Sequence, residues 1–191
     1  TCALPILTKL KDYLRRNGFP FETFAQQKPG LIVMAITSLE LAKQGLSANQ
    51  GIDLYFIKKA SGSKSILQLE TIREQFSVLL ADRYAESMLS QTLDEALEYD
   101  QLVSDLVKFW REGDLDGLQQ ILITDPLQQY PESRDAFDAL FLKRNQKMLT
   151  KIEGYLATQQ SHFVVIGAGH MLGEEGIVEQ LRKRGFRVTR R

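Results

Sequence analysis

The segment Phe163-Val164-Val165-Ile166-Gly167-Ala168-Gly169-His170 decides the expected fold. Its first residues are apolar and mostly β-branched, which is typical of a strand buried on both faces. The glycines then break the run and deliver one histidine before the stretch Gly173-Glu174-Glu175-Gly176, which predicts a helix start. Ligands of α/β sheets bind where strands end and helices begin, so His170 is a candidate functional residue. The alternative is a histidine that only closes a loop.

The glycines of this segment do not match a dinucleotide-binding turn. That turn needs Gly-x-Gly-x-x-Gly, whereas Gly173 comes one residue too late after Gly167 and Gly169. The acidic residue expected about 20 positions later is also missing, because the chain ends in Phe186-Arg187-Val188-Thr189-Arg190-Arg191. We therefore expect no nucleotide cofactor.

A long helical pattern from Pro131 to Gln159 carries one charge on its apolar stripe. The stripe recurs at spacings of three and four residues and consists of Phe137, Phe141, Arg144, Met148, Ile152 and Tyr155. A buried guanidinium is costly unless an anion meets it, so Arg144 predicts a carboxylate opposite. The alternative places Arg144 at the edge of the stripe, with its head group in water.

Glu70 is the candidate for that carboxylate. It ends the predicted short strand 66–69 and precedes Thr71-Ile72-Arg73-Glu74, which has the pattern of a capping box. Glu70 therefore lies, like His170, where a predicted strand meets a helix. The alternative is an exposed loop carboxylate, the usual state of a single glutamate.

These motifs together resemble the TraB/GumN family, which includes bacterial proteins of unassigned function and the animal Tiki metal-dependent proteases that cleave Wnt ligands. The matching residues follow one another in one order, from about Gly51 to the end: Gly51-Ile52-Asp53, Leu69-Glu70-Thr71 with Gln75, Arg144-Asn145 with Met148, and Gly167-Ala168-Gly169-His170 with Leu172-Gly173. Each motif is short, but the ordered combination is specific.

The resemblance implies a metal-dependent, peptidase-like hydrolase with peptide or protein substrates. It implies Glu70, Arg144 and His170 as catalytic residues, and His170 and Glu70 as ligands of a divalent ion of the manganese or cobalt type. The matched positions Gly167, Gly169, Asp53 and Asn145 are then binding residues. The family also implies a periplasmic or extracellular protein.

The family pattern contains a first Gly-x-x-His motif on an N-terminal strand, and no such motif precedes Glu70 here. The only other histidine is His162, and the residue three positions before it is Gln159. Because an open catalytic metal site generally needs about three protein ligands, we expect half of a site and no peptidase activity from this polypeptide by itself. The competing interpretation is a non-catalytic binding or regulatory module that keeps the fold.

Composition fits one domain over residues 1–191, since 43% of residues are hydrophobic and 25% charged. Equal numbers of basic and acidic residues argue against a nucleic acid partner. The longest apolar run, Leu31 to Ile36, is too short to span a bilayer. A single cysteine, Cys2, excludes an intramolecular disulfide and a cysteine-based zinc site.

The expected fold is α/β and mostly helical, with a small mixed sheet of few strands covered by long helices. It corresponds to a truncated TraB/GumN-like domain, helical over 1–62 and with a strand-helix core over 63–191. Strands are predicted at 66–69, 163–166 and 187–189, and a second capping box at Thr92 and Glu95 predicts a helix start. Because so small a sheet leaves an open edge, we expect a homodimer or association with a missing N-terminal segment.

Overall fold

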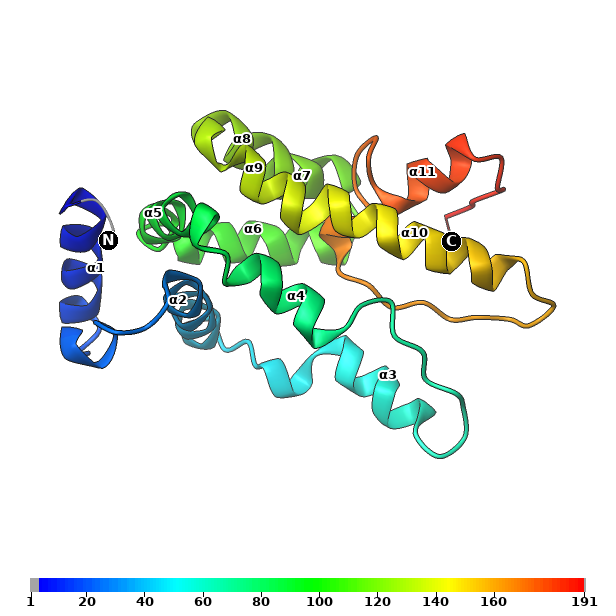
Figure 1. The fold of residues 1–191 in the computed structure, drawn as a ribbon, viewed down its shortest axis with the longest axis horizontal. Coiled ribbons are helices and arrows are strands. Elements are labelled where there is room, and N and C mark those ends of the chain that lie inside the picture. The colour runs from blue at the N-terminus through cyan, green and yellow to red at the C-terminus, as the bar shows by residue number, and fades with distance from the viewer. Residues whose placement is uncertain (1–3, 191) are drawn as a thin grey trace.

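The computed structural model describes residues 4–190, and every regular element in that range is helical. The α-helices are α1 (Leu4–Arg16), α2 (Pro29–Lys43), α3 (Ile52–Ala60), α4 (Ile72–Leu79), α5 (Ala85–Glu95), α6 (Tyr99–Glu112), α7 (Leu115–Gln119), α8 (Asp125–Gln129), α9 (Arg134–Phe137), α10 (Lys143–Leu156) and α11 (Ile177–Lys183). Figure 1 shows α1 at one end of the long axis and α10 running along the other half. Cys2 lies outside the described residues.

The predicted sheet is wrong. Residues 66–69, 163–166 and 187–189 are extended or irregular, and no strand is formed anywhere in residues 4–190. A strand needs a neighbour to bond its N–H and C=O groups, and no described segment pairs with these. The apolar run does not imply burial either, because Phe163 is 74% exposed.

The N-terminal core consists of α1, α2 and α5. Ile6, Leu10, Leu14, Ile36 and Leu89 pack together in it, and Leu89 is fully buried. Pro29 begins α2, where its missing N–H costs nothing, and Gly45 follows the helix with a φ of +75°. Both α1 and α2 lie within the range 1–62 that the sequence predicts to be helical.

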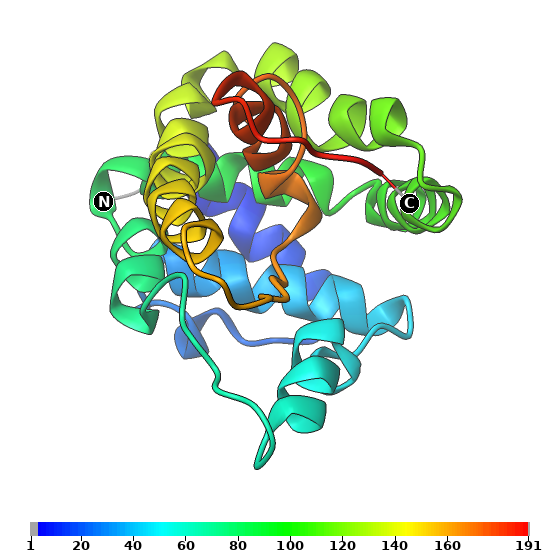
Figure 2. The same ribbon diagram turned by 90° about the vertical axis from the view of Figure 1, so that its right-hand side faces the viewer.

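A second core forms around α10. Met148, Leu149 and Ile152 of this helix pack against Ile177 of α11. Leu69 and Ile166 pack against the same cluster, so both extended segments lie on α10 and lead from it to Glu70 and His170. In both views α3 projects from the rest of the molecule (Figures 1 and 2), and it reaches the second extended segment through Phe56, whose ring centroid lies 4.7 Å from that of Phe163.

Two helix boundaries differ from those predicted. The Thr92 hydroxyl donates to the carbonyl of Met88 inside α5, so Thr92 is not a cap, and the next helix begins only at Tyr99. The pattern from 131 to 159 is divided into α9 and α10 by the π-helical turn η6 (Asp138–Leu142). Periodicity alone does not distinguish one continuous helix from two helices joined by a π-turn, because a π-turn shifts the helical register by only one residue.

No helix within residues 4–190 is long and apolar enough to cross a membrane.

Candidate functional site

Arg144 and Glu70 form a two-pronged ion pair between α10 and the residue before α4. Arg144 Nε donates to Glu70 Oε1 and Nη2 donates to Oε2, each at 2.7 Å. The Arg144 and Glu70 side chains are 15% and 13% exposed, so the pair is largely removed from water. The predicted charge-assisted contact is confirmed, and parallel N–H···O bonds of this kind fix both groups in one orientation.

Local structure positions both partners. The capping box before α4 is confirmed. Thr71 Oγ1 accepts a hydrogen bond from the Glu74 N–H at 3.2 Å, and Glu74 Oε2 accepts one from the Thr71 N–H at 2.9 Å. This fixes the backbone next to Glu70. Arg144 also donates from Nη1 to the carbonyl of Leu140 at 2.9 Å, within the π-turn η6. The guanidinium therefore contacts the carboxylate and its own helix at the same time.

The neighbouring residue, Asn145, holds His170. Asn145 is 3% exposed, its Nδ2 donates to the Glu175 carbonyl at 3.0 Å, and its Oδ1 lies 2.6 Å from His170 Nδ1. The Glu175 carbonyl can only accept, so the amide nitrogen faces it and the amide oxygen faces the imidazole. His170 Nδ1 therefore carries the proton and donates it to Oδ1. Nε2 keeps its lone pair, and no residue from 4 to 190 hydrogen-bonds to it.

His170 is neutral at physiological pH. Burial and the nearby Arg144 charge lower its pKa, Glu70 opposes them only in part, and the net result is a pKa of about 4. The side chain is buried in η7 (Ala168–His170), the short 3₁₀ turn that follows the extended segment. A neutral imidazole with a free Nε2 is the form that binds metal ions or accepts a proton.

Aromatic packing sets the position of the histidine loop. The Phe141 ring lies 5.2 Å from the His170 ring between centroids, and a Cβ added to Gly169 would approach Phe141 Cε1 to 2.8 Å. A side chain at position 169 would therefore displace the Phe141 ring of η6. A Cβ at Gly167 would meet nothing nearer than 3.9 Å, so no comparable constraint acts there.

The structure brings together Glu70, Arg144, Asn145, Gly169 and His170 but does not join Asp53 to them. Asp53 is exposed on α3, and no hydrogen bond or ion pair connects it to the site within the described range. Residues 4–190 also contain no group of three His, Cys, Asp or Glu side chains placed to hold a metal ion. The chemistry of His170 fits a metal ligand, but the described ligand set is incomplete.

Sequence reasoning missed the roles of Phe141 and Glu175 in the site. Phe141 belonged to the predicted stripe and was interpreted only as core, while Glu175 acts through its backbone carbonyl and has no side-chain signal. The adjacency of Arg144 and Asn145 was the available hint, since consecutive residues on a helix point in different directions.

We expect Arg144→Gln to lower the free energy of unfolding by about 3 kcal/mol, because it leaves the Glu70 carboxylate unpaired in a poorly hydrated position. Urea denaturation measures this. Lys147→Gln on the same helix is the matched control, since Lys147 is 64% exposed and 3.5 Å from Glu74, and it should cost below about 1 kcal/mol. Equal effects of the two substitutions would contradict the prediction.

The pKa of His170 predicts a pH-dependent stability. The pKa is about 4 in the folded protein against an ordinary 6.5, so the unfolded chain takes up the proton first as the pH falls. Stability is therefore complete above about pH 6.5 and declines as the pH drops towards 4. Urea denaturation over this range should show a shallower decline in His170→Gln than in the unmodified protein. Parallel curves would contradict the assignment.

Comparison with known proteins finds similar sequences among metalloproteases. Metalloprotease TIKI2 of Danio rerio is 24% identical over 192 residues, covering 85% of this chain and 36% of the relative. Metalloprotease TIKI1 of Danio rerio is 24% identical over 183 residues, covering 83% and 36%. The Metalloprotease TIKI homolog of Amphimedon queenslandica is 29% identical over 80 residues, covering 41% and 13%.

The chain thus spans little more than a third of the length of the zebrafish relatives. No solved structure matches it. The sequence profile of the TraB/PrgY/gumN family matches residues 5–190, which is nearly the whole chain. The chain therefore belongs to the TraB/PrgY/gumN family.

Proposed function

We propose that Glu70, Arg144 and His170 form part of the active site of a metal-dependent hydrolase that acts on peptide bonds. The observation that carries the proposal is the state of His170, which is neutral, oriented through Asn145 and left with a free Nε2 beside a carboxylate. The family membership and the metalloprotease relatives support the same reaction class.

Each residue has a distinct role in this proposal. His170 binds a divalent ion of the manganese or cobalt type through Nε2, with Asn145 fixing the ring as second-sphere partners of metal-bound histidines do. Glu70 is a further ligand or the general base. Arg144 holds the Glu70 carboxylate and supplies a positive charge that would stabilise a developing oxyanion. A bound ion would polarise the substrate carbonyl and acidify a water molecule.

The site needs at least one more ligand than the described residues supply. Three protein ligands are usual for a catalytic metal, and residues 4–190 offer His170 and Glu70. We therefore propose that a ligand from another segment or another molecule completes the site, and that the polypeptide of 191 residues has no peptidase activity alone. The periplasmic or extracellular location implied by the family belongs to the same proposal.

A second candidate is a non-catalytic binding or regulatory module. It is favoured by one observation: both oxygens of Glu70 already accept hydrogen bonds from Arg144. A carboxylate held in this way can serve structure alone, because a buried ion pair need not have a catalytic role. Metal binding separates the two candidates.

Titration with Co²⁺, followed by visible absorption and by metal content after dialysis, tests the proposal. We expect weak binding in the millimolar to micromolar range that His170→Ala abolishes. The control is His162→Ala, which removes the only other histidine, an exposed one, and should leave binding intact. Cobalt binding that is unaffected by His170→Ala, or absent altogether, would favour the non-catalytic module. Peptide cleavage by the 191-residue chain, lost in His170→Ala, would contradict the incomplete site.

We also propose that the extended segments mediate self-association. Neither 65–69 nor 161–166 makes a backbone hydrogen bond to another backbone group in the described structure. Ile66, Leu67 and Phe163 are more than half exposed. Apolar segments with free N–H and C=O groups tend to pair with other chains.

Light scattering on a size-exclusion column should therefore give a mass above the 21.7 kDa of one chain. Phe163→Lys should lower the mass towards that value, whereas Leu97→Lys, at a residue 68% exposed outside both segments, should not. A monodisperse monomer for the unmodified chain would contradict this proposal.

A further inference from the structure

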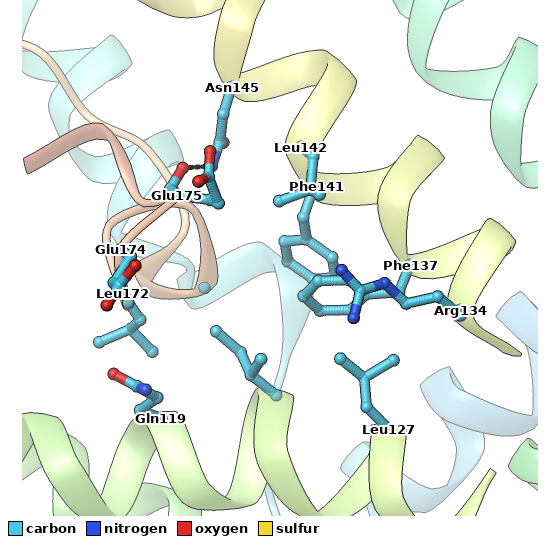
Figure 3. Close-up of a pocket in the computed structure, with 13 residues that line it drawn as sticks. Gln119, Leu127, Arg134, Phe137, Phe141, Leu142, Asn145, Leu172, Glu174 and Glu175 are labelled. Carbon is cyan, nitrogen blue, oxygen red and sulfur yellow. Dashed lines mark hydrogen bonds between the residues drawn. The ribbon is translucent and has the colours of Figure 1, made fainter. Parts of the chain in front are cut away.

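A small cavity lies beside the candidate site and belongs to none of the roles described above. It has a volume of about 170 Å³ and opens between the helices α7 to α8, the helices α9 to α10 and the loop that follows His170. Figure 3 shows the side chains that line it. We refer to it as the side pocket, and its apolar walls are formed by Ile123, Leu127, Phe137, Phe141, Leu142 and Leu172.

The side pocket has the size and lining for one apolar group. Phe137 and Phe141 stack with their ring centroids 4.8 Å apart and form one wall (Figure 3). A cavity of roughly 150 Å³ lined by Leu, Ile and Phe in another protein binds a benzene molecule. A volume of about 170 Å³ therefore admits one aromatic ring or branched aliphatic group, and it is well below the roughly 300 Å³ at which pockets for drug-sized ligands begin.

The rim of the side pocket is polar on two sides. Glu174 and Glu175 lie on one side and Arg134 on the other (Figure 3). Arg134 Nε donates to Asp138 Oδ1 at 2.9 Å, and the two outer nitrogens of Arg134 donate to none of the described residues. Carboxylates accept N–H groups and a guanidinium donates to C=O groups, so this rim complements the main chain on either side of an apolar side chain.

Both facing walls contain a π-helical turn. The turn η4 (Gln120–Thr124) contributes Ile123, and η6 contributes Phe141 and Leu142. Single π-turns inside α-helices are rare and occur frequently at functional sites. Two of them facing one cavity are a second observation, independent of its volume, that points to a ligand.

The side pocket adjoins the site around His170 through shared residues. Asn145, Phe141 and Gly169 all line the pocket. Asn145 also hydrogen-bonds to the His170 imidazole, Phe141 contacts the imidazole ring, and Gly169 precedes His170 in the sequence. A side chain held in the pocket therefore contacts residues that also touch His170.

We propose that the side pocket binds one aromatic or branched aliphatic side chain of a peptide and so selects the peptide presented to the site around His170. The proposal that the pocket binds a side chain depends on the pocket alone. The proposal that this binding selects a substrate rests on the proposed function. The ligand class is thus a peptide with Phe, Tyr, Leu or Ile next to the bond that lies beside His170.

Binding of capped amino acids, measured by nuclear magnetic resonance without added metal, tests the proposal. The probes are the N-acetyl N-methylamides of Phe, Leu, Ala and Lys. Burial of a large apolar side chain contributes about 1.5 to 3 kcal/mol, so the Phe and Leu compounds should bind roughly tenfold or more tightly than the Ala compound. They should also shift the side-chain amide signals of Asn145. Equal binding of the Ala, Lys and Phe compounds, or no shift at Asn145, would overturn the proposal.

Variants at Leu127 test the pocket itself, because this residue lies on α8 and contacts no proposed catalytic group. Leu127→Trp should fill the cavity and abolish the preference for Phe, whereas Leu115→Trp, at a 48% exposed residue of α7, should preserve it. Leu127→Ala should enlarge the cavity, so the N-acetyl N-methylamide of naphthylalanine, a larger probe, should bind this variant more tightly than it binds the unmodified protein. If both Leu127 variants retain the original preference, the side pocket is not the binding site.

Two further arms separate this inference from the proposed function. His170→Ala should keep the preference for the Phe compound and lose Co²⁺ binding. Probe binding therefore tests the side pocket, and Co²⁺ binding tests the proposed function.

Toluene tests the rim: it should bind more weakly than the Phe compound, since it lacks the main-chain groups that the rim complements. Equal binding would overturn the assignment to a peptide.

Discussion

The paired contacts made by Arg144 and Asn145 are the constraint on which the site depends. These consecutive residues of α10 point in different directions and hold two segments that are far apart in the sequence. Arg144 fixes Glu70 through two hydrogen bonds, and Asn145 fixes His170 through one. A single rigid helix thus sets the relative positions of an acid and an imidazole, which loops alone would leave variable.

The electrostatics of the site follow from this arrangement. The guanidinium forms an ion pair with the Glu70 carboxylate, and its positive charge also disfavours a proton on His170. The site therefore contains a paired carboxylate and a neutral imidazole. Asn145 then settles which nitrogen of the neutral ring carries the proton, because the Glu175 carbonyl determines the direction of its amide. The outcome is one free imidazole lone pair, which is the chemical property that the proposed metal site uses.

The side pocket uses the same helix in another way. The π-turn η6 carries Leu140, whose carbonyl accepts from Arg144, and Phe141, which contacts both Gly169 and the pocket. One irregular turn therefore contributes to the ion pair, to the approach of the histidine loop and to the pocket wall.

The sequence by itself determined the features that depend on local patterns or on a strong charge imbalance. The sequence predicted a helical region over 1–62, where α1, α2 and α3 lie, and the Thr71 and Glu74 pattern identified a capping box. The lone charge on the apolar stripe that continues into α10 predicted the partner of Arg144. Only the tertiary structure decided the rest. The apolar runs at 66–69 and 163–166 predicted strands, but a strand exists only when a second segment lies alongside, and pairing is a non-local property that the run does not encode. The Asn145 to His170 bond, the close approach at Gly169 and the side pocket likewise arise where segments distant in sequence meet, so no local pattern could reveal them.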